Sequence, residues 1–175
     1  MTQNALYAAS GPVFASMLNN LAALLDKAEA HATAKKFDVE VLSQSRLSPD
    51  MFPLTFQVGL ATAFAKNAMC RLAGQTPPDF ENTDTTFPLM RARIRKTLDI
   101  VHNITEADFA GADTREISFN VGPDKKITCK GGDYLNHFAL PNFYFHMTAA
   151  YAILRHNGVD IGKRDFTGDP AQLAR

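Results

Sequence analysis

The sequence predicts a mainly α-helical protein, built as a four-helix bundle with a small β-hairpin inserted between the third and fourth helices. Four long segments carry apolar residues three or four positions apart, which is the spacing of one helix face. A shorter segment before the fourth helix alternates polar and apolar residues, as a strand does. A chain of 175 residues has the length of one domain. We therefore expect a single domain over residues 1–175, with a surface tail over about residues 163–175.

The first helix is expected from Leu6 to about Thr33, with an interruption near Gly11-Pro12. Its apolar side is formed by residues at helical spacing, namely Leu6, Val13, Phe14, Met17, Leu18, Leu21, Leu24, Leu25 and Ala28. The segment from Lys35 to Pro49 mixes a short apolar run with serines, which indicates a connection with a brief extended piece. Ser48-Pro49 is then a plausible helix start, because Pro is favoured in the first turn of a helix.

The second and third helices are joined by a linker over residues 75–88, which is rich in Pro, Thr and acidic residues. The second helix is expected from about Phe52 to Ala73, with Gly74 ending it and with one apolar side made of Phe56, Leu60, Ala63, Phe64, Ala68 and Leu72. The third helix is expected from Pro88 to about Asn103, after the capping residues Asp84, Thr85 and Thr86. We expect its basic cluster to be a solvated face that consists of Arg91, Arg93, Arg95 and Lys96.

A β-hairpin is expected from the strands Glu116–Val121 and Lys126–Lys130, with a turn over residues 122–124. Two strands alone are marginally stable in water, so the hairpin must either pack on the helices or pair with another chain. The fourth helix is expected from Pro141 to Asn157, with Gly158 as its cap and a short helical piece over residues 133–138 before it.

Composition excludes several classes of partner. The 18 basic residues balance the 18 acidic ones, so nothing in the net charge favours nucleic acid or an anionic membrane. The chain starts without a basic signal-peptide region and lacks a segment of about 20 apolar residues, so we expect a cytoplasmic protein that does not span a membrane.

Cys70 and Cys129 are expected to be free thiols. The hairpin and the zero net charge together favour a homodimer.

The chemically dense region surrounds His146 in the fourth helix, where aromatic residues line the predicted apolar side. Asn142 lies four residues earlier, on the same helix face. Two interpretations stay open: a buried hydrogen-bonded His–Asn pair, or a ligand-binding or metal site. His137 would lie on the opposite face of an unbroken helix and could approach His146 only if Pro141 breaks it. The remaining histidines lie at helix ends, where an imidazole is favourable without any function: His31, His102 and His156.

A family resemblance rests on these same residues. Asn142-x-x-x-His146, followed twelve residues later by Gly158 in AYAILRHNG, resembles the last helix of the DinB/YfiT-like metalloenzyme superfamily. The segments GGDYL and FALPNFYFHMTAAYAILRHNGVDIGKRDF resemble an uncharacterised bacterial branch of it, a domain of unknown function. The resemblance implies a DinB-like four-helix bundle and a site of three histidines, two in an HxxxH motif on the last helix and one on the second helix.

This chain departs from that pattern. Of the three histidines only His146 is present, Asn142 occupies the first position of the HxxxH motif, and the second helix contains no His. Gln57 is the polar side chain of the second helix that we place opposite them. Such a set of two amides and one imidazole suits zinc or nickel poorly, because these metals prefer imidazole and thiolate ligands.

Two hypotheses follow for the function. In the first, which the resemblance implies, His146 binds a divalent metal such as zinc or nickel or acts as a general base. The protein would then be a metal-dependent transferase or hydrolase, with a small-molecule ligand held by Gln57, Asn142, Tyr144 and His137. In the second, the chain is a metal-free protein that binds a small ligand or a partner and keeps only the bundle scaffold.

Overall fold

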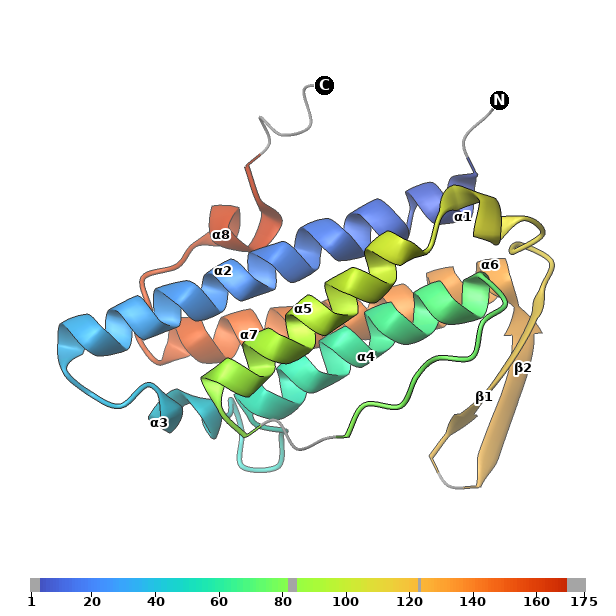
Figure 1. Ribbon diagram of the computed structural model, residues 1–175. Helices are drawn as coiled ribbons and strands as arrows, with labels where there is room; N and C mark the ends of the chain where they lie inside the picture. The colour runs from blue at the N-terminus through green and yellow to red at the C-terminus, as the bar shows by residue number, and fades with distance from the viewer. Residues whose placement is uncertain (1–3, 82–84, 123, 170–175) are drawn as a thin grey trace.

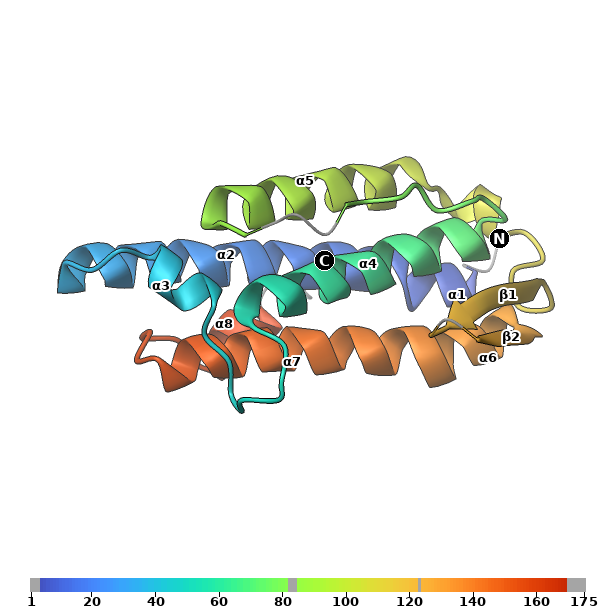
Figure 2. The same ribbon diagram turned by 90° about the horizontal axis from the view of Figure 1, so that it is seen from below.

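The computed structural model describes residues 4–81, 85–122 and 124–169. Four long helices lie side by side as a bundle, as Figures 1 and 2 show: α2 (Gly11–Lys35), α4 (Leu54–Leu72), α5 (Phe87–Asn103) and α7 (Leu140–His156). Helix α4 packs against both α5 and α7, and α2 packs against α5. A two-stranded antiparallel hairpin precedes the last helix, so the predicted fold class is confirmed.

The first predicted helix is divided where the sequence indicated. A short helix, α1 (Ala5–Ala8), ends before Ser10, whose hydroxyl donates to the carbonyl of Leu6 at 2.6 Å. Helix α2 then begins at Gly11 with Pro12 in its first turn. The stretch Ala5–Lys35 is by length and composition apolar enough to cross a membrane. Its apolar residues instead form the bundle core, with Leu18, Leu21, Leu24 and Leu25 fully buried.

The connection after α2 differs from the prediction. Residues 40–43 form a short helix, α3 (Glu40–Ser43), in place of the extended piece, and the Glu40 carboxylate accepts a hydrogen bond from the backbone N–H of Phe87 at 3.0 Å. Ser48-Pro49 does not start a helix. It lies in a turn held by Arg46, whose guanidinium donates to the carbonyl of Met51 at 3.1 Å, and α4 begins only after Pro53.

The buried side of α4 is only partly the predicted one. Ala68 and Leu72 of the predicted side are fully buried, whereas Phe56 is 36% exposed. The helix also fully buries residues outside that side, namely Leu54, Val58, Ala61, Ala65 and Met69. Because α4 lies between α5 and α7, small alanine side chains face its neighbours and the bulky aromatic ones lie at the edges. Gly74 ends the helix as predicted, with φ +74°, and the N–H of Gln75 donates to the carbonyl of Cys70 at 2.8 Å.

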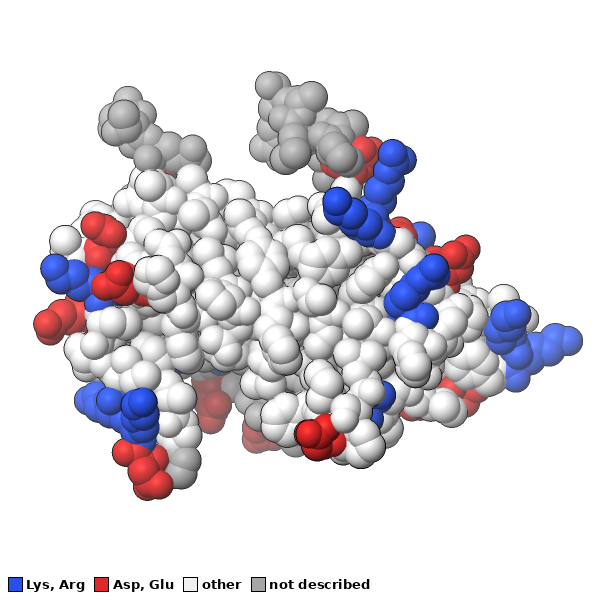
Figure 3. All heavy atoms as spheres, turned by 180° about the vertical axis from the view of Figure 1, so that it is seen from behind, with Lys and Arg blue, Asp and Glu red and all other residues white. Residues whose placement is uncertain are grey.

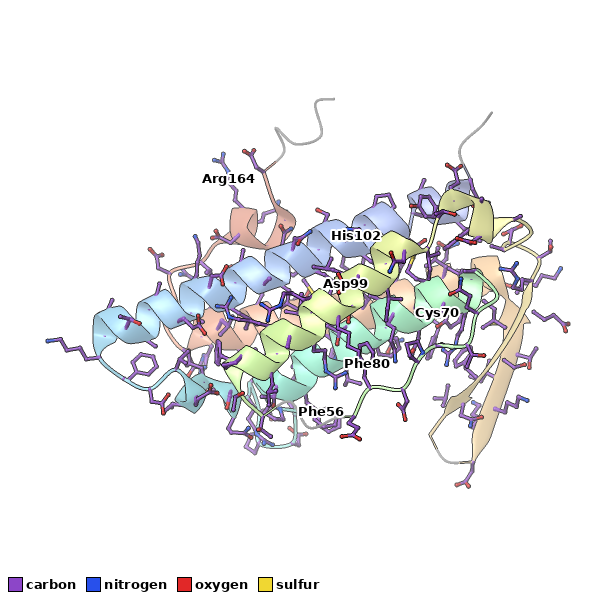
Figure 4. The ribbon with its side chains drawn as sticks, viewed as in Figure 1. Phe56, Cys70, Phe80, Asp99, His102 and Arg164 are labelled. Carbon is purple, nitrogen blue, oxygen red and sulfur yellow. The ribbon has the colours of Figure 1, made fainter. Side chains whose placement is uncertain are left out.

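Helix α5 lies where it was predicted, but one of its basic residues is not solvated. Arg93 is 6% exposed, packs against the ring of Phe80 at 5.4 Å and donates to the carbonyl of Glu81. Lys66 of α4 is equally buried and places its Nζ 4.4 Å from the same ring, which Figure 4 labels. Two buried cations thus hold the linker against the bundle. Asp84, a predicted capping residue, lies outside the described residues.

The hairpin has strands β1 (Glu116–Val121) and β2 (Lys125–Lys130), with Ile117 opposite Cys129 and Phe119 opposite Ile127. Ile117 and Phe119 are buried, and the Phe119 ring contacts the ring of Tyr134 at 5.1 Å. Of the two alternatives for covering the hairpin, the structure therefore has it packed on the helices of its own chain.

The path into the last helix is continuous. Helix α6 (Gly131–Tyr134) passes through a π-helical turn (Leu135–Ala139) directly into α7, so the predicted helical piece is joined to the fourth helix and Pro141 does not break it. Pro141 is tolerated because it lies in the first turn of α7. Part of the predicted surface tail is a short helix, α8 (Lys163–Thr167), which packs on α2. Residues 170–175 lie outside the described part of the chain.

Candidate functional site

A chain of two hydrogen bonds joins α7 to the start of α4. The Nδ1 atom of His146 lies 2.8 Å from the Oε1 atom of Gln57, and the Nε2 atom of Gln57 donates to the carbonyl of Phe52 at 3.0 Å. Gln57 is 1% exposed and His146 is 8% exposed. The structure thus brings together the imidazole and the amide that the sequence placed on opposite helices.

This chain of bonds determines where the imidazole carries its proton. The Gln57 amide must direct its NH₂ group toward the Phe52 carbonyl, so its oxygen faces His146 and can only accept. Nδ1 of His146 is therefore the donor, and Nε2 carries the lone pair. Among the described residues Nε2 has no hydrogen-bond partner.

Burial keeps this imidazole neutral. Removal from water lowers the pKa of His146 from 6.5 to about 4. The Phe64 ring stacks on the imidazole with centroids 5.6 Å apart and planes 14° from parallel, and the Phe145 ring meets it edge-on at 5.2 Å. At neutral pH the group is consequently an uncharged hydrogen-bond acceptor with aromatic neighbours.

Asn142 lies one helical turn from His146 but does not bond to it. Its Nδ2 donates to the carbonyl of Phe138 at 2.8 Å, within its own helix, so the expected His–Asn pair is not formed. Its Oδ1 has no partner among the residues that the structure describes. Asn142 therefore adds a second free acceptor on the same side of α7.

Phe138, Asn142 and His146 follow one another at four-residue intervals, and Phe64 of α4 contacts the first and last of them. We call this region the α4–α7 seam and define it by Gln57, Phe64, Phe138, Asn142 and His146. Phe64, Phe138 and Asn142 are only half-buried, so the seam is not sealed from solvent. The sequence placed Phe64 on the apolar side of the second helix. Phe138 was not identified, although its regular four-residue spacing from Asn142 and His146 was a signal for it.

Two predicted ligand residues lie away from the seam. His137 is exposed on the unbroken helical path, nine residues before His146, because Pro141 does not break the helix. Tyr144 is 38% exposed on the outer side of α7, where its ring contacts that of Phe143 at 5.5 Å. Partial burial raises the pKa of Tyr144. The structure thus does not bring either side chain to His146.

The residues present do not fit a zinc or nickel ion. Within residues 4–81, 85–122 and 124–169, no three His, Cys, Asp or Glu side chains lie close enough together to hold a metal. Around His146 the other polar groups are neutral amides, and the Gln57 oxygen already accepts from Nδ1. Neutral amide oxygens are weak ligands for metals that prefer imidazole and thiolate.

Comparisons with known proteins agree with the fold. A family model described as "Domain of unknown function (DUF1993)" matches residues 6–167. The chain is also similar to a crystal structure of a DinB family member protein from Shewanella denitrificans, with 44% sequence identity and a TM-score of 0.87. The match covers 94% of this chain and 92% of that one. A comparison with curated proteins finds no match.

Proposed function

The chain belongs to the DUF1993 family of DinB-like proteins, and we propose that it is a metal-free binding protein. Its ligand is a small neutral molecule with an aromatic or otherwise apolar body and at least one hydroxyl or N–H donor, bound at the α4–α7 seam.

The observation that carries this proposal is the free lone pair on Nε2 of a neutral, oriented imidazole. Asn142 Oδ1 offers a second acceptor one helical turn away. Both groups accept and neither can donate, so a complementary ligand must bring the protons. A site built to accept a hydrogen bond discriminates against a ligand that lacks the donor, because its own polar group is then buried unpaired.

The surroundings favour a neutral ligand over a charged one. From Tyr134 to Leu154 the sequence contains no Asp, Glu, Lys or Arg, so no opposite charge on this helical stretch would offset the desolvation of an ion. The rings of Phe64, Phe138 and Phe145 supply aromatic surface beside His146. Aromatic rings pack well against other flat, apolar bodies.

The same facts favour binding over catalysis. A general base works best when its pKa lies near the working pH, whereas the pKa of His146 is about 4. The donor set also does not suit a metal that could activate water. The transferase or hydrolase hypothesis needs a general base or a bound metal, and this site is poorly suited to supply either.

Phenol and toluene test the proposal, because they share a ring and differ in one hydroxyl donor. We expect phenol to bind the protein several-fold to ~10-fold more tightly than toluene in ligand-observed NMR titrations, since one net hydrogen bond contributes about 0.5–1.5 kcal/mol. In His146→Phe this preference should disappear. In His137→Phe, the matched control at an exposed His of the same helical path, it should remain. Equal affinities of the unmodified protein for the two probes would contradict the proposal.

A further inference from the structure

The outer side of α7 is unusual for a bundle helix. Before its last turn, in which Arg155 and His156 are exposed, the exposed residues of α7 are Pro141, Tyr144, Phe145 and Thr148, spaced as one helical stripe, and Phe145 is 57% exposed. Helix α5, on the opposite side of the bundle in Figure 2, exposes the ordinary set of charged residues, including Arg95, Lys96 and Asp99. A stripe that faces solvent normally carries such charges, so the uncharged aromatic stripe of α7 has the character of a binding surface.

A second pair of exposed rings is connected to this stripe. Phe52 is 53% exposed and stacks on Phe56 with centroids 4.4 Å apart. The Phe52 carbonyl accepts from Gln57, which in turn bonds to His146, the neighbour of Phe145. We define the aromatic face as Phe52, Phe56, Tyr144, Phe145 and Thr148. Figure 3 views the molecule from the side of α7, and the middle of this view contains no Lys, Arg, Asp or Glu.

The loop that presents Phe52 is held rigid from within. Arg46 donates to the carbonyls of Pro49 and Met51, and the Ser48 hydroxyl donates to the Asp50 carboxylate. Arg46 and Asp50 are exposed, as Phe52 is, and each hydrogen-bonds to a group of the loop itself. A rigid loop loses little conformational entropy when another surface covers it.

We propose that the aromatic face is the interface between two copies of this chain. In a dimer with two-fold symmetry, residues near the axis meet their own copies, so any charge there would face a like charge. A charge-free face avoids this repulsion. A different protein is ordinarily recognised with the help of opposite charges, which this face does not offer. The zero net charge of the chain adds no repulsion between copies.

The exposed area indicates a weak dimer. An aromatic side chain buries roughly 150–250 Å², so each half-exposed ring of the face contributes about 100 Å². The four rings together give of the order of 400 Å², which is about half of the roughly 800 Å² that each partner contributes to a standard interface. We therefore expect dissociation in the micromolar range.

Sedimentation equilibrium over about 5–500 µM protein tests the proposal. The unmodified chain should approach twice 19.2 kDa at high concentration. Phe145→Lys should raise the dissociation constant at least ~30-fold, because it buries an unpaired charge at the centre of the interface. Leu89→Lys is the matched control, since Leu89 is a 43% exposed apolar residue of α5, and it should leave the dimer intact.

Tyr144→Lys, a second exposed position of the same stripe, should weaken the dimer as Phe145→Lys does, and circular dichroism checks that each variant is folded. A monomer throughout the concentration range, a dimer that both α7 variants leave unchanged, or equal weakening by Leu89→Lys would each overturn the proposal.

Discussion

Replacing the Gln57–His146 pair with apolar residues should remove a specific part of the pH dependence of stability. The pKa of His146 is about 4 in the folded protein, against 6.5 for an ordinary histidine. Between these values the unfolded chain binds a proton that the folded chain does not, so stability falls as the pH falls from 6.5 toward 4. At 1.36 kcal/mol for each tenfold change in proton affinity, the full effect is about 3 kcal/mol, and about 2–3 kcal/mol is lost between pH 7 and pH 4.5.

The variant Gln57→Leu/His146→Phe removes both partners, so neither is left buried and unpaired. Urea unfolding at about pH 7 and about pH 4.5 measures the effect. Circular dichroism is the suitable probe because the chain contains no Trp. All other ionisable groups are identical in the two proteins, so the difference between the two pH dependences isolates His146. We expect the unmodified protein to lose about 2–3 kcal/mol more than the variant.

An equal loss of stability in the two proteins would contradict this prediction, because it would mean that His146 binds its proton in the folded state as easily as in the unfolded one. A single His146→Phe change would not serve as well, since it leaves the Gln57 oxygen buried without a donor and lowers stability at every pH.

Two further predictions concern the scaffold. Gly131→Ala should lower the free energy of unfolding by more than about 2 kcal/mol, because the new Cβ would collide with the backbone carbonyl of Ala112. Gly59→Ala should raise it by up to about 1 kcal/mol, because Gly59 lies inside a helix and its new Cβ would meet nothing within 4 Å. Thermal or urea unfolding measures both changes. Equal effects at the two glycines would contradict the packing described. Phe80→Leu should cost about 1–2 kcal/mol, because it keeps an apolar side chain but removes the ring face that Lys66 contacts; an unchanged unfolding midpoint would show that this contact contributes nothing.

Periodicity predicted the long helices and the hairpin because each buries one side against a neighbour that the pattern reveals. It did not predict the connection over residues 36–53, whose form depends on Glu40 binding the N–H of Phe87 and on Arg46 binding loop carbonyls. These partners are distant in sequence or belong to the backbone, so the local spacing of apolar and polar residues does not reveal them. Arg93 was misplaced for a similar reason, since the residues that cover it lie on the linker.

The candidate site was predictable in part. His146 was singled out by its aromatic surroundings, and Gln57 was the polar residue placed across from it. The partner of Asn142 was not predictable, because its amide can bond either to a side chain or to the carbonyl four residues earlier, and the structure has the second. Tyr144 was assigned to the site from its chemistry alone, although its position on the helix places it on the outer side.

The accepting lone pair of the α4–α7 seam depends on which nitrogen of His146 carries the proton. Long-range ¹H–¹⁵N correlation spectra of the ¹⁵N-labelled protein distinguish the two neutral forms of an imidazole and follow each ring nitrogen as the pH changes. We expect that Nδ1 carries the proton, that Nε2 is unprotonated, and that this state persists from neutral pH down to about pH 5. A proton on Nε2, or titration of the ring near pH 6.5, would show that the Gln57–His146 bond does not orient a neutral imidazole as described.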